Sequence, residues 1–278
     1  MPNREPIASS STSQFQMNVT VYGSVKPCPV LIRRTQRSLK ANSGGRDYFS
    51  DITLHDARNA GGMRVEFSVT ATSPQGALRA GNVYLSQLCD LLTVVTRSPV
   101  WFYMPDDDSA EERIRSHRRS ASVDRIMTED EWSWITGNLV YLRRKHPRFL
   151  AASSWYRKGL LGRDVIDDFC CFWRVSERIA YSYADKSGWS DDDKQRSQVR
   201  KCVSQLRDDL FPENAPSILA DETVSKIVKL RNDISHGNVP ITLDIIDTAS
   251  EFISPLEAVA YEILARLRDT ELVTEDVA

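Results

Sequence analysis

The sequence predicts an α+β protein, in which a small antiparallel-sheet α+β domain is followed by a C-terminal all-α helical bundle. Three observations lead to this fold class. Short apolar runs separated by turn residues fill the region 15–104, and apolar residues recur at helical spacing over 125–272. A highly charged segment over 105–124 separates the two regions, and 278 residues suffice for two ordinary domains.

The first region opens with a polar stretch and continues with short strands. Residues 1–14 are rich in serine, and we expect them to be disordered. Strands are predicted, with glycine-containing turns between them, over residues 15–23, 28–34, 47–55 and 62–71. A helix over 73–97 and a last strand over 100–104 complete a domain that we interpret as a sensor or adaptor.

The segment 105–124 changes from an acidic block to a basic one and contains almost no apolar residues. Such a pattern is typical of a solvated linker. Its basic tract RIRSHRR could contact RNA phosphates, although solvation is the commoner explanation of a charge run.

The helical region carries capping and breaking signals between its apolar stripes. Thr128 and Glu131 match a capping box, Asp221 is placed to cap the fifth helix, and Pro255 should kink or break the last one. The predicted helices cover residues 129–145, 147–158, 164–184, 188–210, 222–235 and 242–268.

Composition restricts the classes of function. The formal net charge of −2 gives no general attraction to nucleic acid, so DNA coating is not expected. No apolar run is long enough for a membrane helix, the polar N-terminus lacks a signal peptide, and the five cysteines show no C-x-x-C spacing. We therefore expect a cytoplasmic protein, and the absence of zinc and phosphate-loop signatures predicts neither a metal nor a cofactor.

The most informative stretch is KLRNDISHGN, at the end of the fifth predicted helix. On a helical wheel Arg231 falls inside the apolar arc, between Ile227 and Val228. Asn232 and His236 are four residues apart and lie one above the other at the edge of that arc. A guanidinium on an apolar face is costly unless it is paired or reaches a cleft.

Two interpretations of this stretch remain open at the level of sequence. In one, Gly237 is a left-handed C-cap, and Arg231 and His236 only stabilise the negative end of the helix dipole. An internal salt bridge to Glu177 or Asp168 then holds the arginine. In the other, the stretch is an active site.

The residue types suit one reaction in particular. Histidine can move a proton in either direction, arginine can bind a phosphate whose charge grows in the transition state, and asparagine can orient either group. Together they suit cleavage of RNA by attack of its own 2′-hydroxyl, which requires no metal and no protein nucleophile.

The stretch R-N-D-I-S-H-G resembles the signature of the HEPN superfamily, an arginine followed after four to six residues by histidine, with a polar residue after the arginine. None of the other histidines, His55, His117 and His146, has an arginine at that distance. The long predicted helix over 164–184, with FCCFWRVSERIA, is similar to the second major helix of HEPN domains. The resemblance covers about residues 128–270.

The resemblance implies a homodimer in which two copies of the motif face each other. Many HEPN proteins are metal-independent endoribonucleases of toxin–antitoxin, abortive-infection or CRISPR-associated systems, and others are non-catalytic nucleotide-binding or assembly modules. An N-terminal sheet followed by such a bundle is similar to HEPN proteins of phage defence and of methylamine-utilisation loci. RNA, a second copy and an antitoxin or defence-complex partner are therefore expected.

The resemblance also assigns roles to the three residues of the motif. His236 would be the general acid or base, Arg231 would stabilise the transition state, and Asn232 would position His236 or the phosphate. An RNA-cleaving enzyme is favoured over the non-catalytic alternative.

Two further groups of residues are interpreted as packing. Cys170 and Cys171 lie in an apolar stripe with no histidine nearby, so a buried role is favoured over a nucleophile. Trp132 and Trp134 could stack on bases, but core or interface packing is favoured.

Overall fold

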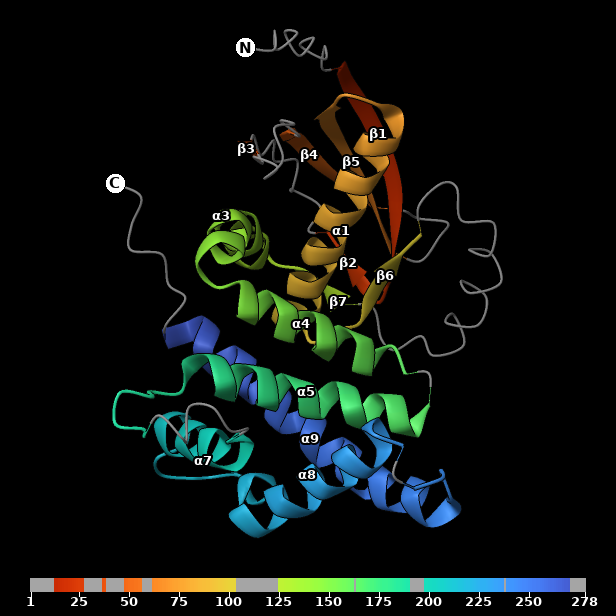
Figure 1. The fold of residues 1–278 in the computed structure, drawn as a ribbon. Helices are drawn as coiled ribbons and strands as arrows, with labels where there is room; N and C mark the ends of the chain where they lie inside the picture. The colour runs from red at the N-terminus through yellow and green to blue at the C-terminus, as the bar shows by residue number, and fades with distance from the viewer. Residues whose placement is uncertain are drawn as a thin grey trace, which may run out of the picture. The chain divides into compact units, whose positions relative to one another are not determined.

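The computed structural model has an antiparallel sheet in its N-terminal part and helices in its C-terminal part (Figure 1), which confirms the α+β class. It describes residues 13–27, 37–38, 48–56, 62–103, 125–162, 164–190, 198–237 and 239–270. Three predicted features lie outside these residues, namely most of the disordered N-terminus, the strand over 28–34 and the charged linker 105–124.

The larger sheet has five strands among the described residues, in the order β3-β4-β5-β1-β6. Each neighbouring pair is antiparallel, and Val19 of β1 lies opposite Val65 of β5. The strands are β1 (Ser13–Gly23), β3 (Arg37–Ser38), β4 (Tyr48–Asp56), β5 (Gly62–Ala71) and β6 (Val100–Phe102). A separate parallel pair joins β2 (Val25–Lys26) to β7 (Arg125–Ile126).

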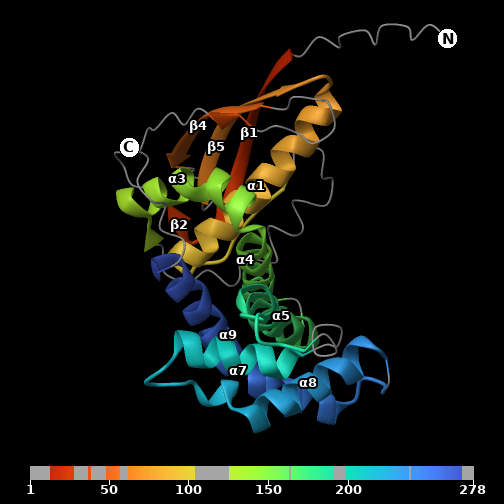
Figure 2. The ribbon, with the colours of Figure 1, turned by 60° about the vertical axis from the view of Figure 1, so that its left-hand side comes forward.

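Apolar and polar side chains alternate along the strands, so that one face of the sheet is buried against α1 (Pro74–Thr96). Val65, Phe67 and Val69 of β5 are buried, as the period of two requires. Gly81 allows a close contact between α1 and the sheet, because a Cβ there would lie 2.5 Å from the sulfur of Met17. Figure 2 shows α1 running along the sheet beside β1 and β5.

The predicted capping box at the start of α3 (Glu129–Lys145) is confirmed. The backbone N–H of Thr128 donates to Glu131 Oε2 at 2.8 Å, and the N–H of Glu131 donates to Thr128 Oγ1 at 3.2 Å. Partial burial alone would raise the pKa of Glu131, but hydrogen bonds from Arg125 and from the Thr128 backbone outweigh it, and the pKa is lowered.

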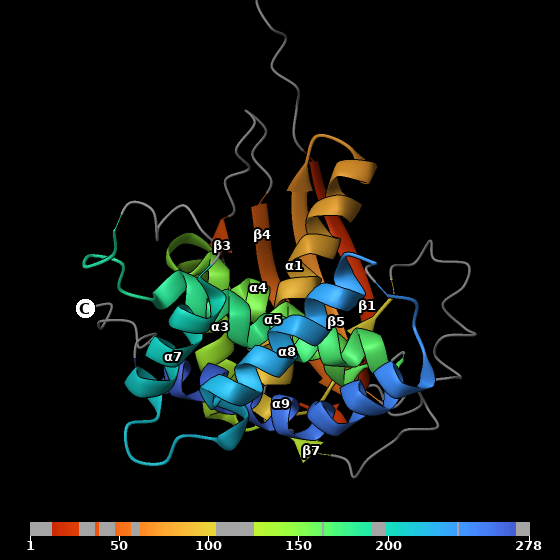
Figure 3. The ribbon, with the colours of Figure 1, turned by 60° about the horizontal axis from the view of Figure 1, so that its bottom comes forward.

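The helical part is organised around α5, which packs against α4, α7 and α9. Its members are α4 (Pro147–Leu160), α5 (Val165–Tyr183), α7 (Val199–Leu210), the short η2 (Ser217–Leu219), α8 (Asp221–Ser235) and α9 (Leu243–Thr270). Figure 3 views this part from the side of α7 and α8. None of the helices in the described part combines the length and the apolar character that a membrane span requires.

The apolar stripe predicted on α5 forms its buried face. Phe169, Phe172, Trp173, Val175 and Ile179 are all buried. Full burial of such a side chain stabilises the fold by about 1.5–3 kcal/mol. The stripe is therefore the main reason why α5 occupies the middle of the helical part.

Two details of the predicted helices are wrong. Residues 188–190 are not helical, although the predicted helix starts at 188, because the turn that Asp185 forms by accepting from the N–H of Ser187 competes with helix. Residues 191–197 of that prediction lie outside the described residues, and α7 is described from Val199. The N-cap of α8 is Ala220, whereas the carboxylate of Asp221 accepts a hydrogen bond from Arg207 at 2.9 Å.

The predicted break at Pro255 does not occur, since this residue lies inside α9 without ending it. Proline removes the hydrogen bond to the carbonyl four residues earlier, at Glu251. Both residues are exposed, so water can bond to the freed carbonyl. The helix therefore tolerates proline on this side.

Contacts divide the chain into two compact units, 1–89 with 100–136 and 90–99 with 137–278. The predicted boundaries, 15–104 and 125–272, fall elsewhere, because the end of α1 makes its contacts within the helical unit. Asp90 pairs with Arg157 of α4 at 2.6 Å, with both side chains nearly fully buried. Desolvation raises the pKa of Asp90 even though Arg157 opposes the shift.

Gly159 lies at a tight contact between α4 and α5, and it provides a stability test. A Cβ there would lie 2.6 Å from the ring of Phe172. We expect Gly159→Ala to lower the free energy of unfolding by about 1–3 kcal/mol, because the ring must move. Urea unfolding followed by circular dichroism measures the change.

Gly137→Ala is the matched control for this prediction. Gly137 lies inside α3 and a Cβ there would meet no atom within 4 Å. The same substitution should therefore stabilise the protein by about 0.5–1 kcal/mol through helix propensity alone. Equal effects of the two substitutions would contradict close packing at Gly159.

Candidate functional site

The motif stretch occupies the last turn and the C-terminal cap of α8. Ile227 is buried, residues 231–234 are half-buried, and residues 235–237 are exposed. His236 is the C-cap and keeps a nearly helical backbone, with φ −94° and ψ −2°. Gly237 has φ of 63° and donates its N–H to the carbonyl of Ile234, which confirms the predicted left-handed cap.

Arg231 points toward α5, where Glu177 binds it. Its Nη2 donates to both carboxylate oxygens of Glu177 at 3.1 Å, and its Nη1 donates to Asn232 Oδ1 at 2.9 Å. The side chains of Arg231 and Glu177 are 27% and 16% exposed. Of the two carboxylates considered from the sequence, Glu177 rather than Asp168 is therefore the partner.

One nitrogen of the same guanidinium has no acceptor. Arg231 Nε is buried and makes no hydrogen bond within the part of the chain that the structure describes. A buried donor left unsatisfied costs about 1–3 kcal/mol, and native proteins keep few of them. Arg231 therefore does not have the full set of bonds that a purely structural arginine would be expected to make.

His236 lies apart from the other two residues of the motif. Its side chain is exposed and makes no hydrogen bond, ion pair or ring contact with any described residue. Only its backbone is tied to the motif, through the bond from its N–H to the carbonyl of Asn232 at 3.0 Å. The structure thus joins Arg231 to Asn232 and leaves the imidazole open to solvent.

A pocket of about 420 Å³ opens beside Arg231 on the surface of the helical unit. Its lining comes from α4, α5 and α8 and consists of Trp155, Arg174, Glu177, Arg178, Tyr181 and Arg231. Three arginines therefore face one glutamate, and that glutamate is already bound to Arg231. We call this set of residues the arginine pocket.

Sequence reasoning missed the arginine pocket, although part of it could have been found. Arg174, Glu177, Arg178 and Tyr181 follow the spacing i, i+3, i+4, i+7 and so form a second, polar stripe on α5. Trp155 could not be assigned to it, because no local pattern shows which face of α4 lies next to this stripe.

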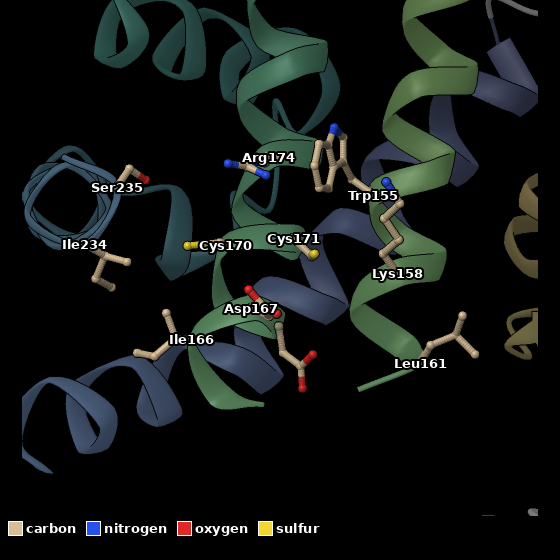
Figure 4. A pocket seen from close by; sticks show the side chains of 11 residues that line it. Trp155, Lys158, Leu161, Ile166, Asp167, Cys170, Cys171, Arg174, Ile234 and Ser235 are labelled. Atoms are coloured by element: carbon tan, nitrogen blue, oxygen red, sulfur yellow. The ribbon is translucent and has the colours of Figure 1, made fainter. Parts of the chain in front are cut away.

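A second pocket of about 490 Å³ shares Trp155 and Arg174 with the first (Figure 4). Trp155 carries two cations over its ring, with Arg174 Cζ at 4.3 Å and Lys158 Nζ at 4.4 Å from the centroid. Cys170 and Cys171 line this pocket as well. Figure 4 shows Trp155 of α4 beside Arg174 of α5, with Cys171 on the same side, whereas Cys170 points toward Ile234 and Ser235 of α8.

The chemistry of the two cysteines favours packing, as expected. Burial raises the pKa of Cys171 to about 11 and also raises the pKa of Cys170. Both thiols therefore stay protonated at neutral pH, and the thiolate that a nucleophile needs is scarce. Trp132 is fully buried in its own unit, which is the packing role predicted for it.

Within the described ranges, no group of three or more His, Cys, Asp or Glu side chains is placed to hold a metal ion. No protein-family model, no curated protein and no solved structure matches the chain. The geometry of the site therefore carries the functional argument.

The Arg231–Glu177 pair predicts a specific loss of stability. We expect Arg231→Ala to lower the free energy of unfolding by about 1–3 kcal/mol, because Glu177 is left largely buried without its partner. Urea unfolding measures the effect. Lys229→Ala, an exposed position on the same helix, should change stability by less than about 0.5 kcal/mol. Equal effects of the two substitutions would contradict a stabilising role for the pair.

Proposed function

We propose that this protein is a metal-independent endoribonuclease of HEPN type that acts on RNA as a homodimer. One observation carries the proposal. Arg231 is held in place by Glu177 and Asn232, while His236, at the end of the same helix, is exposed and has no side-chain partner in the described part of the chain. A fixed cation and an unengaged imidazole are the two groups that the reaction requires.

Arg231 would stabilise the negative charge that develops on the phosphate. Glu177 and Asn232 fix the orientation of its guanidinium, so little reorganisation is needed when the transition state forms. Its side chain remains partly exposed and lines the arginine pocket, where a phosphate can approach it. Asn232 accepts a hydrogen bond from the guanidinium through its side-chain oxygen and thereby positions Arg231.

His236 would transfer the protons of the reaction. The 2′-hydroxyl of RNA attacks the adjacent phosphorus and loses its proton to a base, and the 5′-oxygen leaves with a proton from an acid. The products are a 2′,3′-cyclic phosphate and a 5′-hydroxyl. One imidazole cannot be base and acid in the same step, so the same histidine of a second copy would supply the other role.

The residues after the motif support pairing with a second copy. Val239, Ile241 and Leu243 are all exposed, and Leu243 is 76% exposed. Apolar side chains grouped on a surface are typical of protein interfaces. These three directly follow the cap of α8, so an interface there would bring two copies of His236 toward each other.

The cellular setting follows from the same proposal. The likeness to HEPN rests on R-N-x-x-x-H at the end of a late helix and on the stretch FCCFWRVSERIA of α5, which contains Glu177. A toxin or defence effector of this type would work in the cytoplasm under the control of an antitoxin or a defence complex. The four cysteines that the structure describes as free suit a reducing compartment.

RNA cleavage in EDTA tests the proposal. We expect the wild-type protein to cleave RNA without added metal, and His236→Ala to reduce the rate about 10²- to 10⁴-fold through loss of proton transfer. Gel analysis of end-labelled RNA measures both rates, and Lys229→Ala should cleave like the wild type. Equal cleavage by wild type and His236→Ala, or none by either, would overturn the assignment.

The second candidate is a non-catalytic module of the same fold. The observation in its favour is that Glu177 already occupies Arg231 and neutralises it. Such a module would bind a nucleotide or a partner, and the ligand would raise its melting temperature without any degradation of RNA.

A further inference from the structure

One side of β1 is without a neighbouring strand over most of its length. β5 pairs with β1 over residues 13–22, whereas β6, on the other side, pairs only with residues 21–23. Figure 1 shows β6 beside one end of β1. Among the residues that the structure describes, none makes a backbone hydrogen bond to residues 13–20 on the β6 side. We call residues 13–20 the open edge.

The backbone of the open edge has hydrogen-bonding groups that β5 does not use. In an antiparallel sheet the N–H and C=O groups of successive residues point alternately to the two neighbouring strands. About half of these groups in the open edge therefore point away from β5. Such a row of groups is a template for a strand of another chain, and most proteins protect it by charge, proline or a bulge.

The open edge has none of these protections. Its sequence, SQFQMNVT, contains no charged residue and no proline, and its pairing with β5 continues without a shift. β4, on the far side of β5, is different. The sequence of β4 contains Asp51 and Asp56. Its pairing with β5 is also shifted between Ser50 and Thr53. The protections that the sheet has at β4 are thus missing at β1.

Both faces of the open edge suit pairing with an identical strand. Directly opposite residues of an antiparallel pair lie on the same face of the sheet. Phe15 and Met17 are half-buried on the face that α1 covers, so the same residues of a second copy would bury them further. On the other face the exposed residues are amides, namely Gln14, Gln16 and Asn18, so no like charges would meet.

We propose that two copies of this protein pair through their open edges, antiparallel to each other, so that the two sheets become one. A second copy is the partner that the chemistry favours, because an uncharged strand meets itself without repulsion and has no charge with which to select a different strand. A two-fold axis perpendicular to the sheet makes this contact isologous. The contact lies in the sheet-containing unit, apart from the one proposed near His236, and does not depend on it.

Analytical ultracentrifugation of the full chain tests the proposal. The background is Leu243→Asp, which replaces the exposed apolar side chain of the other proposed contact. We expect this protein to remain a dimer. Adding Gln16→Lys should weaken the dimer about three- to tenfold, because two like charges then lie close together across the axis. A mixture of the Gln16→Lys and Gln16→Glu proteins should associate more tightly than either protein alone.

Thr70→Lys is the matched control for Gln16→Lys. Thr70 lies on the same face of the sheet, opposite Gln14, but on β5, which has a strand on each side. The same new charge should therefore leave the dimer unchanged, and circular dichroism confirms that each variant is folded. The proposal is overturned if the Leu243→Asp protein is a monomer at every concentration, or if Gln16→Lys has no greater effect than Thr70→Lys.

Hydrogen exchange of the backbone amides locates the contact. In concentrated Leu243→Asp protein, the amides of the open edge that point away from β5 should exchange slowly. Adding Gln16→Lys should make them exchange about three- to tenfold faster, in step with dissociation. Equal exchange in the two proteins would place the contact elsewhere and refute the proposal. A dimer of this kind without RNA cleavage refutes only the nuclease, and cleavage without it refutes only the open-edge contact.

Discussion

The ion pair between Arg231 and Glu177 is the interaction on which the site depends. It joins two helices whose paired residues are 54 positions apart in the sequence. It holds the guanidinium, which also donates to Asn232, against α5 in the lining of the arginine pocket. A pair of this kind is costly to break once formed, and it fixes one geometry among many. The same contact thus serves stability and the proposed chemistry.

The opposite faces of α5 explain how packing produces the site. The buried face carries Phe172 and its aromatic neighbours, and Gly159 allows α4 to approach that ring closely. This approach brings Trp155, one turn earlier on α4, against Arg174 on the exposed side of α5. A larger residue at position 159 would therefore disturb both the core and the pocket.

Local signals in the sequence were sufficient for much of this structure. The fold class, the capping box at Thr128, the cap at Gly237 and the inward direction of Arg231 all follow from spacing and residue type within one or two helical turns. Non-local contacts were not predictable in this way. Asp221 binds Arg207 of another helix instead of capping its own, and the arginine pocket needs three helices that no local pattern places together. The sequence offered Glu177 only as one of two possible salt-bridge partners, since a helical wheel shows which way the Arg231 side chain points and not which carboxylate it meets.

A charge-swapped variant tests the central claim most directly. In Glu177→Arg/Arg231→Glu the ion pair can re-form with the guanidinium on α5 instead of α8. If Arg231 both stabilises the fold and acts on the phosphate, the double variant will be more stable to urea than either single variant but will not cleave RNA. Cleavage at the wild-type rate, or a stability no higher than that of the single variants, would contradict the account.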